Sequence, residues 1–109
     1  LRSSGVLLFA SGNVVHNLRL VEWGKPGRGT PWAEEFDTAA RRIMTSMPGD
    51  IGRLVDEPSF SRAVPTPDHF VPLLYIAGVA KAAGTPAEVL ISGYDLGSLS
   101  MTSYVVPGH

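Results

Sequence analysis

The sequence predicts an α/β domain in which helices flank a small mixed sheet. Three observations point to this fold class: a short apolar run near the start, two segments with apolar residues at helical spacing, and two strand-like segments at the end. The chain has 109 residues, of which 44% are hydrophobic and 17% are charged, as is typical of one compact domain. We therefore expect residues 1–109 to form a single domain.

The first element is the apolar run from Gly5 to Gly12, which ends in small polar residues. Its length and composition predict a strand that is buried on both faces, as in a mostly parallel sheet. A strand that begins so early has no preceding helix to cover it. We therefore expect its covering element to come from outside this sequence.

A helix is predicted between the glycine-rich loop 24–30 and the pair Pro48-Gly49. Thr30 can cap its start, and Pro31 is favourable at the first helical position. Apolar residues then recur at helical spacing and define the face that should be buried. These residues are Trp32, Phe36, Ala39, Ala40, Ile43 and Met47.

A second helix is predicted from about Asp68 to about Ala83, where Gly84 closes it. Pro72 is tolerated only in the first turn of a helix, so His69 should lie at or just before the helix start. The apolar face of this helix comprises Phe70, Leu73, Leu74, Ala77 and Ala80.

The remaining segments are two strands, a short helical turn and two loops. The turn is predicted over residues 50–57 and a proline-rich loop over 58–67. Strands are predicted over 88–92 and 98–106, joined by the loop 93–97. The last strand alternates, with Leu99, Met101, Ser103 and Val105 on one face and Ser100, Thr102 and Tyr104 on the other.

Charge and composition exclude several functional classes. Nine basic and ten acidic residues give a net charge of −1, so no overall charge favours nucleic acid or an anionic membrane. The absence of cysteine excludes a disulfide framework, a zinc finger, an iron–sulfur cluster and a thiol nucleophile. No apolar run approaches the roughly 20 residues that span a bilayer, and no secretory signal pattern is present. We therefore expect a cytoplasmic protein.

Two of the three histidines lie where a side chain could face a ligand. His16 follows the predicted first strand, and ligands of open α/β sheets gather at the carboxyl ends of strands. His69 lies at a predicted helix start. Both rings could instead be structural hydrogen-bonding groups, and Asp68 could be a helix cap or a ligand, of which we favour the cap. His109 is terminal and expected to be frayed.

Four motifs occur in order along nearly the whole chain. They are Ser-Gly-Asn-Val-Val-His-Asn-Leu-Arg at 11–19, Trp32-Ala33 with Phe36-Asp37, Thr-Pro-Asp-His-Phe-Val-Pro-Leu-Leu at 66–74, and Gly-Ser-Leu-Ser-Met-Thr-Ser at 97–103. Together they resemble the C-terminal part of the class III (LigB-type) extradiol ring-cleavage dioxygenases, in their DOPA-dioxygenase branch. The agreement of four separated motifs is specific, whereas one motif alone would be weak.

The resemblance implies a partial version of the LigB-type dioxygenase fold, forming the C-terminal portion of a larger catalytic domain. It also implies an enzyme that opens catechol-type aromatic diols with dioxygen and a non-haem metal, Fe(II) or Zn(II). Such a metal accepts imidazole ligands while leaving positions open for catecholate and oxygen.

The resemblance also assigns roles to individual residues. His16 is expected to be a metal-site residue or the catalytic acid/base, because a neutral imidazole can accept a proton near neutral pH. His69 is expected to be a metal-site residue. Asn13 and Asn17, from the first motif, are expected to bind substrate.

Two departures from the family leave alternatives open. Val64 stands where relatives often carry a histidine, and the N-terminal half that supplies further metal histidines has no counterpart in these 109 residues. Two histidines are fewer than the three protein ligands usual for a catalytic metal, so we expect the isolated chain to be inactive. It should require the missing N-terminal half or a second subunit. The alternatives are a non-catalytic truncated paralogue that forms homo-oligomers, and a symmetric dimer that builds one metal site from two copies of His16 and His69.

Overall fold

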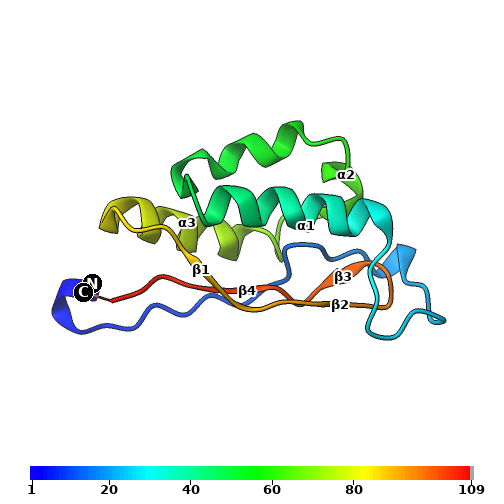
Figure 1. The fold of residues 1–109 in the computed structure, drawn as a ribbon, viewed down its shortest axis with the longest axis horizontal. Helices are drawn as coiled ribbons and strands as arrows, with labels where there is room; N and C mark the ends of the chain where they lie inside the picture. Colours follow the sequence, from blue (N-terminus) through cyan, green and yellow to red (C-terminus); the bar gives the residue numbers. More distant parts are fainter. Residues whose placement is uncertain (109) are drawn as a thin grey trace.

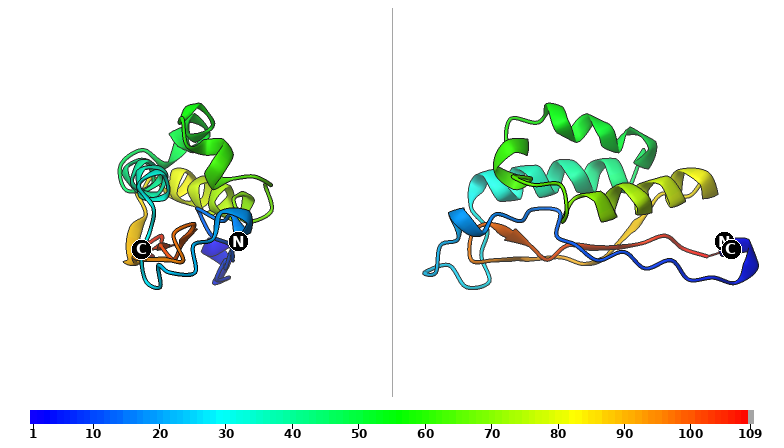
Figure 2. Two further views of the ribbon diagram at one scale, coloured as in Figure 1. Left: turned by 90° about the vertical axis from the view of Figure 1, so that its right-hand side faces the viewer. Right: turned by 180° about the vertical axis from the view of Figure 1, so that it is seen from behind.

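The computed structural model describes residues 1–108 and has two layers (Figure 1). Helices form one layer, and extended segments from both ends of the chain form the other (Figures 1 and 2). The predicted fold class, an α/β domain with helices flanking a small sheet, is confirmed. In chain order the elements are η1 (Arg2–Ser4), η2 (Leu18–Leu20), α1 (Pro31–Met44), η3 (Pro48–Asp56), α2 (Phe60–Ala63), α3 (Val71–Ala83), β1 (Glu88–Ile91), β2 (Tyr94–Asp95), β3 (Leu99–Ser100) and β4 (Ser103–Val105), where η denotes a 3-10 helix.

Helix α1 begins at Pro31 as predicted and buries Phe36, Ala40 and Met44 completely. Thr30 occupies the capping position as predicted, but its hydroxyl donates to the carbonyl of Gly97 at 2.8 Å and makes no hydrogen bond to the helix. One detail of the prediction is wrong. Met47 lies beyond the helix end and is 56% exposed, so Met44 occupies the buried position.

The predicted turn over 50–57 is present as η3, and the predicted loop after it contains the short helix α2. The ring of Phe60 on α2 packs against Phe36 at 6.1 Å and against Phe70 at 5.8 Å between centroids. This contact between residues far apart in the chain stabilises a turn of helix that local sequence does not indicate.

Helix α3 ends as predicted, with Gly84 in the left-handed conformation at a φ of 66°. Its start differs, because Phe70 and not Asp68 occupies the capping position. The Asp68 carboxylate instead accepts a hydrogen bond from the Thr66 hydroxyl at 2.5 Å. Across residues 1–108, no helix combines the length and the apolar character needed to cross a membrane.

The strands form two antiparallel pairs, β1 with β4 and β2 with β3. Glu88 lies opposite Val105 in the first pair, and Tyr94 lies opposite Ser100 in the second. The predicted strand over 98–106 is therefore divided into β3 and β4, and the predicted loop 93–97 contains β2. A single parallel bridge joins Gly29 to Gly97.

The prediction of a buried first strand is wrong. Residues 6–12 are extended but form no strand, and Leu7 and Phe9 are each 88% exposed. The reason is that no other strand in the described part of the chain pairs with this segment. Side chains tie its two ends to the C-terminal strands: Arg2 donates to the carbonyl of Val106, and Asn13 donates to that of Ser100.

Candidate active site

The fold brings His16 and His69 together from two distant motifs. Their rings stack with centroids 3.6 Å apart and planes inclined by only 7°. The backbone of His16 is held on both sides: its N–H donates to the carbonyl of Ala63 at 3.0 Å, and it forms a bridge with Leu99. His69 lies two residues before α3 begins at Val71. Each ring therefore extends from a short loop that is fixed by packed elements.

Gly12 allows the two loops to approach each other. A Cβ atom at this position would lie 2.4 Å from the carbonyl oxygen of His69 and 3.1 Å from the ring of Pro72. Any other residue would push the two motifs apart, since a backbone oxygen cannot yield as a flexible side chain does. Gly12 therefore sets the spacing of the site, a role that the motif alone did not reveal.

The two asparagines of the first motif fasten the loop that carries His16. Asn17 is buried, donates from Nδ2 to the carbonyl of Arg62 at 2.8 Å, and accepts at Oδ1 from the N–H of Arg19 at 3.0 Å. Asn13 donates from Nδ2 to the carbonyl of Ser100 at 2.8 Å. Both side chains thus have a structural use here, and their binding of substrate stays a prediction.

A cavity of about 380 Å³ lies beside His69. It is bounded by the extended N-terminal segment on one side and by residues of β1 and β4 on the other, including Tyr104. The hydroxyl of Tyr104 is buried and has no hydrogen-bond partner among the described residues. Burial, with the nearby Asp37 carboxylate, raises the pKa of Tyr104, so this hydroxyl stays protonated and able to donate.

The electrostatics favour a neutral imidazole at His16. Burial lowers the pKa of His16 below 6.5, and a positive charge on the stacked His69 would lower it further. The Asp68 carboxylate lies 3.8 Å from Nε2 of His69, and the hydrogen bond from Thr66 is the main cause that lowers the pKa of Asp68. The pair thus combines the neutral ring of His16 with the ring of His69, which has the Asp68 carboxylate beside it.

This arrangement does not by itself fit a complete metal centre. Residues 1–108 contain no cluster of three or more histidine, aspartate and glutamate side chains suited to one ion. A metal lies in the plane of an imidazole ligand, about 2.0–2.1 Å from its nitrogen. One ion cannot lie in both planes of two parallel stacked rings. The Nδ1 atom of His69 is buried and has no hydrogen-bond partner among these residues. The metal roles of His16 and His69 stay predictions.

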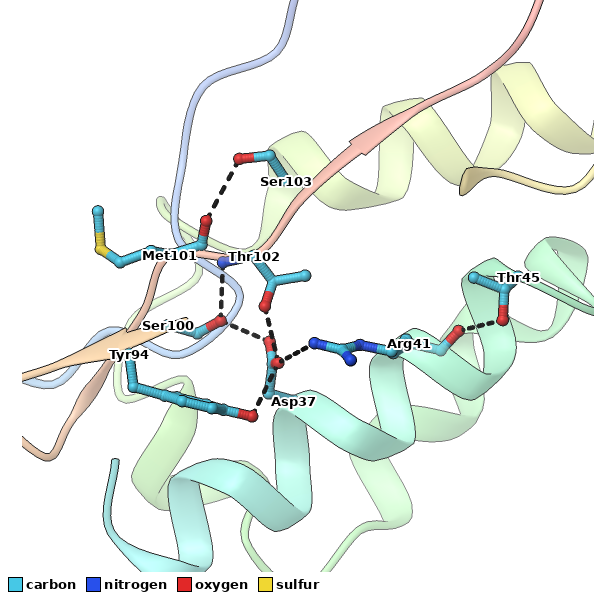
Figure 3. A network of polar contacts seen from close by, with 8 residues as sticks. All are labelled: Asp37, Arg41, Thr45, Tyr94, Ser100, Met101, Thr102 and Ser103. Carbon is cyan, nitrogen blue, oxygen red and sulfur yellow. Dashed lines mark hydrogen bonds and ion pairs between the residues drawn. The ribbon is translucent and has the colours of Figure 1, made fainter. Parts of the chain in front are cut away.

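One buried carboxylate, that of Asp37 on α1, was not among the predicted functional residues. Asp37 of α1 is fully buried and accepts hydrogen bonds from the hydroxyls of Ser100 at 2.5 Å, Thr102 at 2.8 Å and Tyr94 at 3.0 Å (Figure 3). Arg41 lies 3.7 Å from the same carboxylate. Two features of the sequence could have indicated this network. Asp37 is an acidic residue next to Phe36 on the apolar face of the predicted helix, and Ser100 and Thr102 share one face of the last predicted strand.

Two further positions from the sequence analysis do not contribute to the pair of rings. Val64, noted above as a departure from the resembled family, is half-buried and packs against the hydrophobic core. His109 lies outside the described residues.

Comparisons with known proteins agree with the motif resemblance. No protein-family profile matches the chain. The chain is 40% identical over 107 residues to a protein of Escherichia coli named 4,5-DOPA dioxygenase extradiol, covering 94% of this chain and 39% of that protein. It is 29% identical over 116 residues to a Beta vulgaris protein of the same name, covering 95% of this chain and again 39% of the relative.

A solved structure shows the same fold. It is the crystal structure of an uncharacterized protein from Escherichia coli, with a TM-score of 0.84 and 36% sequence identity. The match covers 98% of this chain and 45% of that one. The chain therefore spans less than half the length of each of these relatives. Over nearly its full length it is similar to part of the extradiol DOPA dioxygenases, and this confirms the resemblance that the four motifs indicated.

Proposed function

We propose that this chain carries part of the active site of an extradiol ring-cleavage dioxygenase that acts on catechol-type substrates. The observation that carries the proposal is the meeting of His16 and His69, the histidines of two separate family motifs, beside a cavity of about 380 Å³. The names of the two dioxygenase relatives support it, with DOPA as the substrate that those names suggest.

In this proposal the residues of the chain hold and move protons on the substrate. His16, whose pKa is lowered by burial, is the neutral base that accepts a proton from a ring hydroxyl. Gly12 and Asn13 keep the two loops in register, so that His16 stays stacked on His69, whose side chain lines the cavity.

A divalent ion, Fe(II) or Zn(II), belongs to the proposal only as part of a larger ligand set. His69, which lines the cavity, is the residue of this chain that we assign to that set. The further donors must come from a polypeptide equivalent to the part of the relatives that this chain does not match.

The test is a chimera in which this chain replaces the matching part of the Escherichia coli dioxygenase. We expect the chimera, supplied with Fe(II), to open the ring of DOPA, and His16→Ala and His69→Ala each to reduce turnover at least about 100-fold. Trp23→Ala is the matched control, because this exposed aromatic side chain lies outside the site. A folded chimera without ring cleavage, or a His69→Ala chimera with full activity, would overturn the proposal.

A second candidate is a non-catalytic module that associates with copies of itself. The exposure of Leu7 and Phe9 favours it. This candidate predicts a dimer of the isolated chain at micromolar concentration and an inactive chimera. A monomer in sedimentation, together with an active chimera, would exclude it.

A further inference from the structure

One buried serine, Ser98 in the fourth sequence motif, contacts the loop that carries His16. Its side chain is completely buried and is not among the residues that line the cavity beside His69. Because burial of an unpaired hydroxyl is costly, a buried serine is expected to have a hydrogen-bond partner. The Ser98 hydroxyl donates to the carbonyl of Asn17 at 2.6 Å, and Asn17 directly follows His16 in the chain.

Ser98 holds both backbone groups of Asn17. The Ser98 carbonyl accepts from the N–H of Asn17 at 3.2 Å, while the Ser98 hydroxyl donates to the carbonyl of the same residue. That carbonyl also accepts from the N–H of Leu20 at 3.2 Å, so both of its acceptor positions are used. The peptide groups on either side of Asn17 are therefore fixed, and Ser98 takes part in fixing each of them.

These bonds determine the direction of the His16 side chain. In the peptide group before His16, the N–H donates to the carbonyl of Ala63 at 3.0 Å, and the carbonyl, that of Val15, accepts from the N–H of Ser100 at 3.0 Å. The peptide group after His16 is held by Ser98. Because a residue has only two freely rotating backbone angles, holding the peptide planes on both sides of it fixes where its side chain points.

Thr30 anchors Ser98 in turn to the start of α1. Its N–H, at 2.9 Å, and its hydroxyl, at 2.8 Å, both donate to the carbonyl of Gly97, which belongs to the peptide group before Ser98. A threonine in the capping position normally uses its hydroxyl to bind the first turn of its own helix. Thr30 makes no such bond. Departures from a local preference are expected where a functional site requires them.

We propose that Ser98 is a positioning residue for His16, and that Thr30 anchors Ser98 to α1. Ser98 acts through the backbone of the loop that stacks the His16 ring on His69. The proposal rests on the proposed function, because that function makes His16 the base that accepts a proton. A displaced base transfers protons more slowly but leaves the binding of substrate unaffected, so Ser98 should influence turnover rather than affinity.

The first measurement compares Ser98→Ala with Ile51→Val in the isolated chain. Ser98→Ala removes the hydroxyl without adding atoms. Ile51→Val is the control for lost stability, because Ile51 is buried on η3 and takes part in none of these hydrogen bonds. Stacking at 3.6 Å moves the ring-proton NMR signals of the histidines upfield. We expect Ser98→Ala to lose most of this displacement and Ile51→Val to keep it. Parental shifts in Ser98→Ala, or an equal loss in Ile51→Val, would overturn the proposal.

The second measurement is the turnover of DOPA by the chimera with the Escherichia coli dioxygenase. We expect Ser98→Ala to lower kcat roughly tenfold to 100-fold while KM stays unchanged. Ile51→Val should change neither constant. A Ser98→Ala chimera that keeps the kcat of the unmodified chimera, or that differs from it only in KM, would contradict a positioning role.

A pair of variants at Thr30 keeps the test decisive if Ser98→Ala does not fold. Thr30→Val retains the shape of threonine without its hydroxyl, whereas Thr30→Ser retains the hydroxyl. Because this hydroxyl makes no hydrogen bond to α1, circular dichroism should show the same helix content in both. We expect Thr30→Val to lose ring-proton displacement and kcat, and Thr30→Ser to keep both. Equal ring-proton shifts and equal kcat in the two variants would overturn the proposal.

The two readouts separate this inference from the proposed function. If the unmodified chimera does not cleave DOPA, the proposed function is overturned, while a displaced ring stack in Ser98→Ala still supports the role of Ser98 in placing the His16 ring. If the chimera cleaves DOPA and both Ser98→Ala and Thr30→Val leave kcat and the ring stack unchanged, only the positioning role is overturned.

Discussion

At the scale of single residues, the site depends on how closely two loops can approach. The rings of His16 and His69 stack at 3.6 Å because the backbone at Gly12 passes directly against the carbonyl of His69. Neither loop is regular secondary structure, so hydrogen bonds from Asn13 and Asn17 replace the ladder of a sheet or helix in fixing them. Rigid placement of this kind is what a proton-transferring pair requires.

Substitution of Gly12 by alanine should disturb the pair of rings. The added methyl group would lie 2.4 Å from the His69 oxygen, so the loops must separate, at a cost of about 1–3 kcal/mol in the free energy of unfolding. Urea denaturation measures the stability, and the ring-proton NMR shifts of the two histidines report the stacking. Gly24→Ala is the control, because a Cβ atom at Gly24 meets nothing within 4 Å. Unchanged ring-proton shifts in Gly12→Ala would show that the close approach is unimportant.

At the scale of elements, the Asp37 carboxylate connects α1 to the C-terminal strands (Figure 3). Two of the three hydroxyls that it binds, those of Ser100 and Thr102, lie on the buried face of the segment running from β3 to β4, and the third belongs to Tyr94 on β2. Because Ser100 also donates its N–H to the carbonyl of Val15, the connection continues to the loop that carries His16. The Asp37 carboxylate is thus linked through Ser100 to the loop that carries His16, although Asp37 does not line the cavity beside His69.

Replacement of Asp37 by asparagine should be strongly destabilising. An amide offers one acceptor and one donor group where three hydroxyls donate, so at least one buried hydroxyl loses its partner, at a cost of roughly 2–4 kcal/mol. Chemical denaturation of Asp37→Asn and of Asp56→Asn, an exposed site on η3, gives the comparison. Equal stability of the two variants would contradict a central role for the carboxylate.

The same network predicts how stability depends on alkaline pH. Burial is the main cause that raises the pKa of Tyr94 to about 12, with further contributions from the Asp37 carboxylate and the hydrogen bond to it. Below the unfolded-state pKa of about 10, both states are protonated and the contribution of Tyr94 to stability is fully present. Above that pH the unfolded state ionises first, so this contribution is lost as the pH rises toward the folded-state value.

The measurement is a spectrophotometric titration of tyrosine ionisation in the native chain and in Tyr94→Phe. The difference between the two curves isolates Tyr94 and should have its midpoint near pH 12. The free energy of unfolding of the unmodified chain should also fall more steeply above pH 10 than that of the variant. A difference curve centred near pH 10 would show that Tyr94 is solvated.

At the scale of the whole molecule, the backbone amides are expected to be protected unevenly against hydrogen exchange. The core lies between the helices and the strands, with Phe36, Ala40 and Leu54 fully buried, whereas residues 5–9 are exposed. Free energies of local opening follow backbone pairing and apolar contact. The N-terminal segment should therefore be the least stable part of the extended layer.

Amide exchange should show this division in the isolated chain. We expect amides within α1 and α3 to exchange only on global unfolding, and amides of residues 7–12 to exchange nearly as fast as in an unstructured peptide. Mass spectrometry of peptides covering the two regions measures both rates. Slow exchange of residues 7–12 in a dilute, monomeric sample would contradict the arrangement described here.

The sequence by itself determined the features that depend on near neighbours. Helical spacing and the stop at Gly84 predicted α1 and α3, and alternation predicted the C-terminal strands, because a helix or strand imposes its own period on the buried side chains. The motifs likewise identified His16 and His69 as candidates.

Only the tertiary structure decided which of these features meet. The stacking of His16 on His69, the burial of Asp37 and the formation of α2 all depend on partners far away in the chain, which local patterns do not encode. The first strand was predicted wrongly for the same reason. An apolar extended segment becomes a buried strand only when another strand supplies its hydrogen bonds, and residues 1–108 provide none for it.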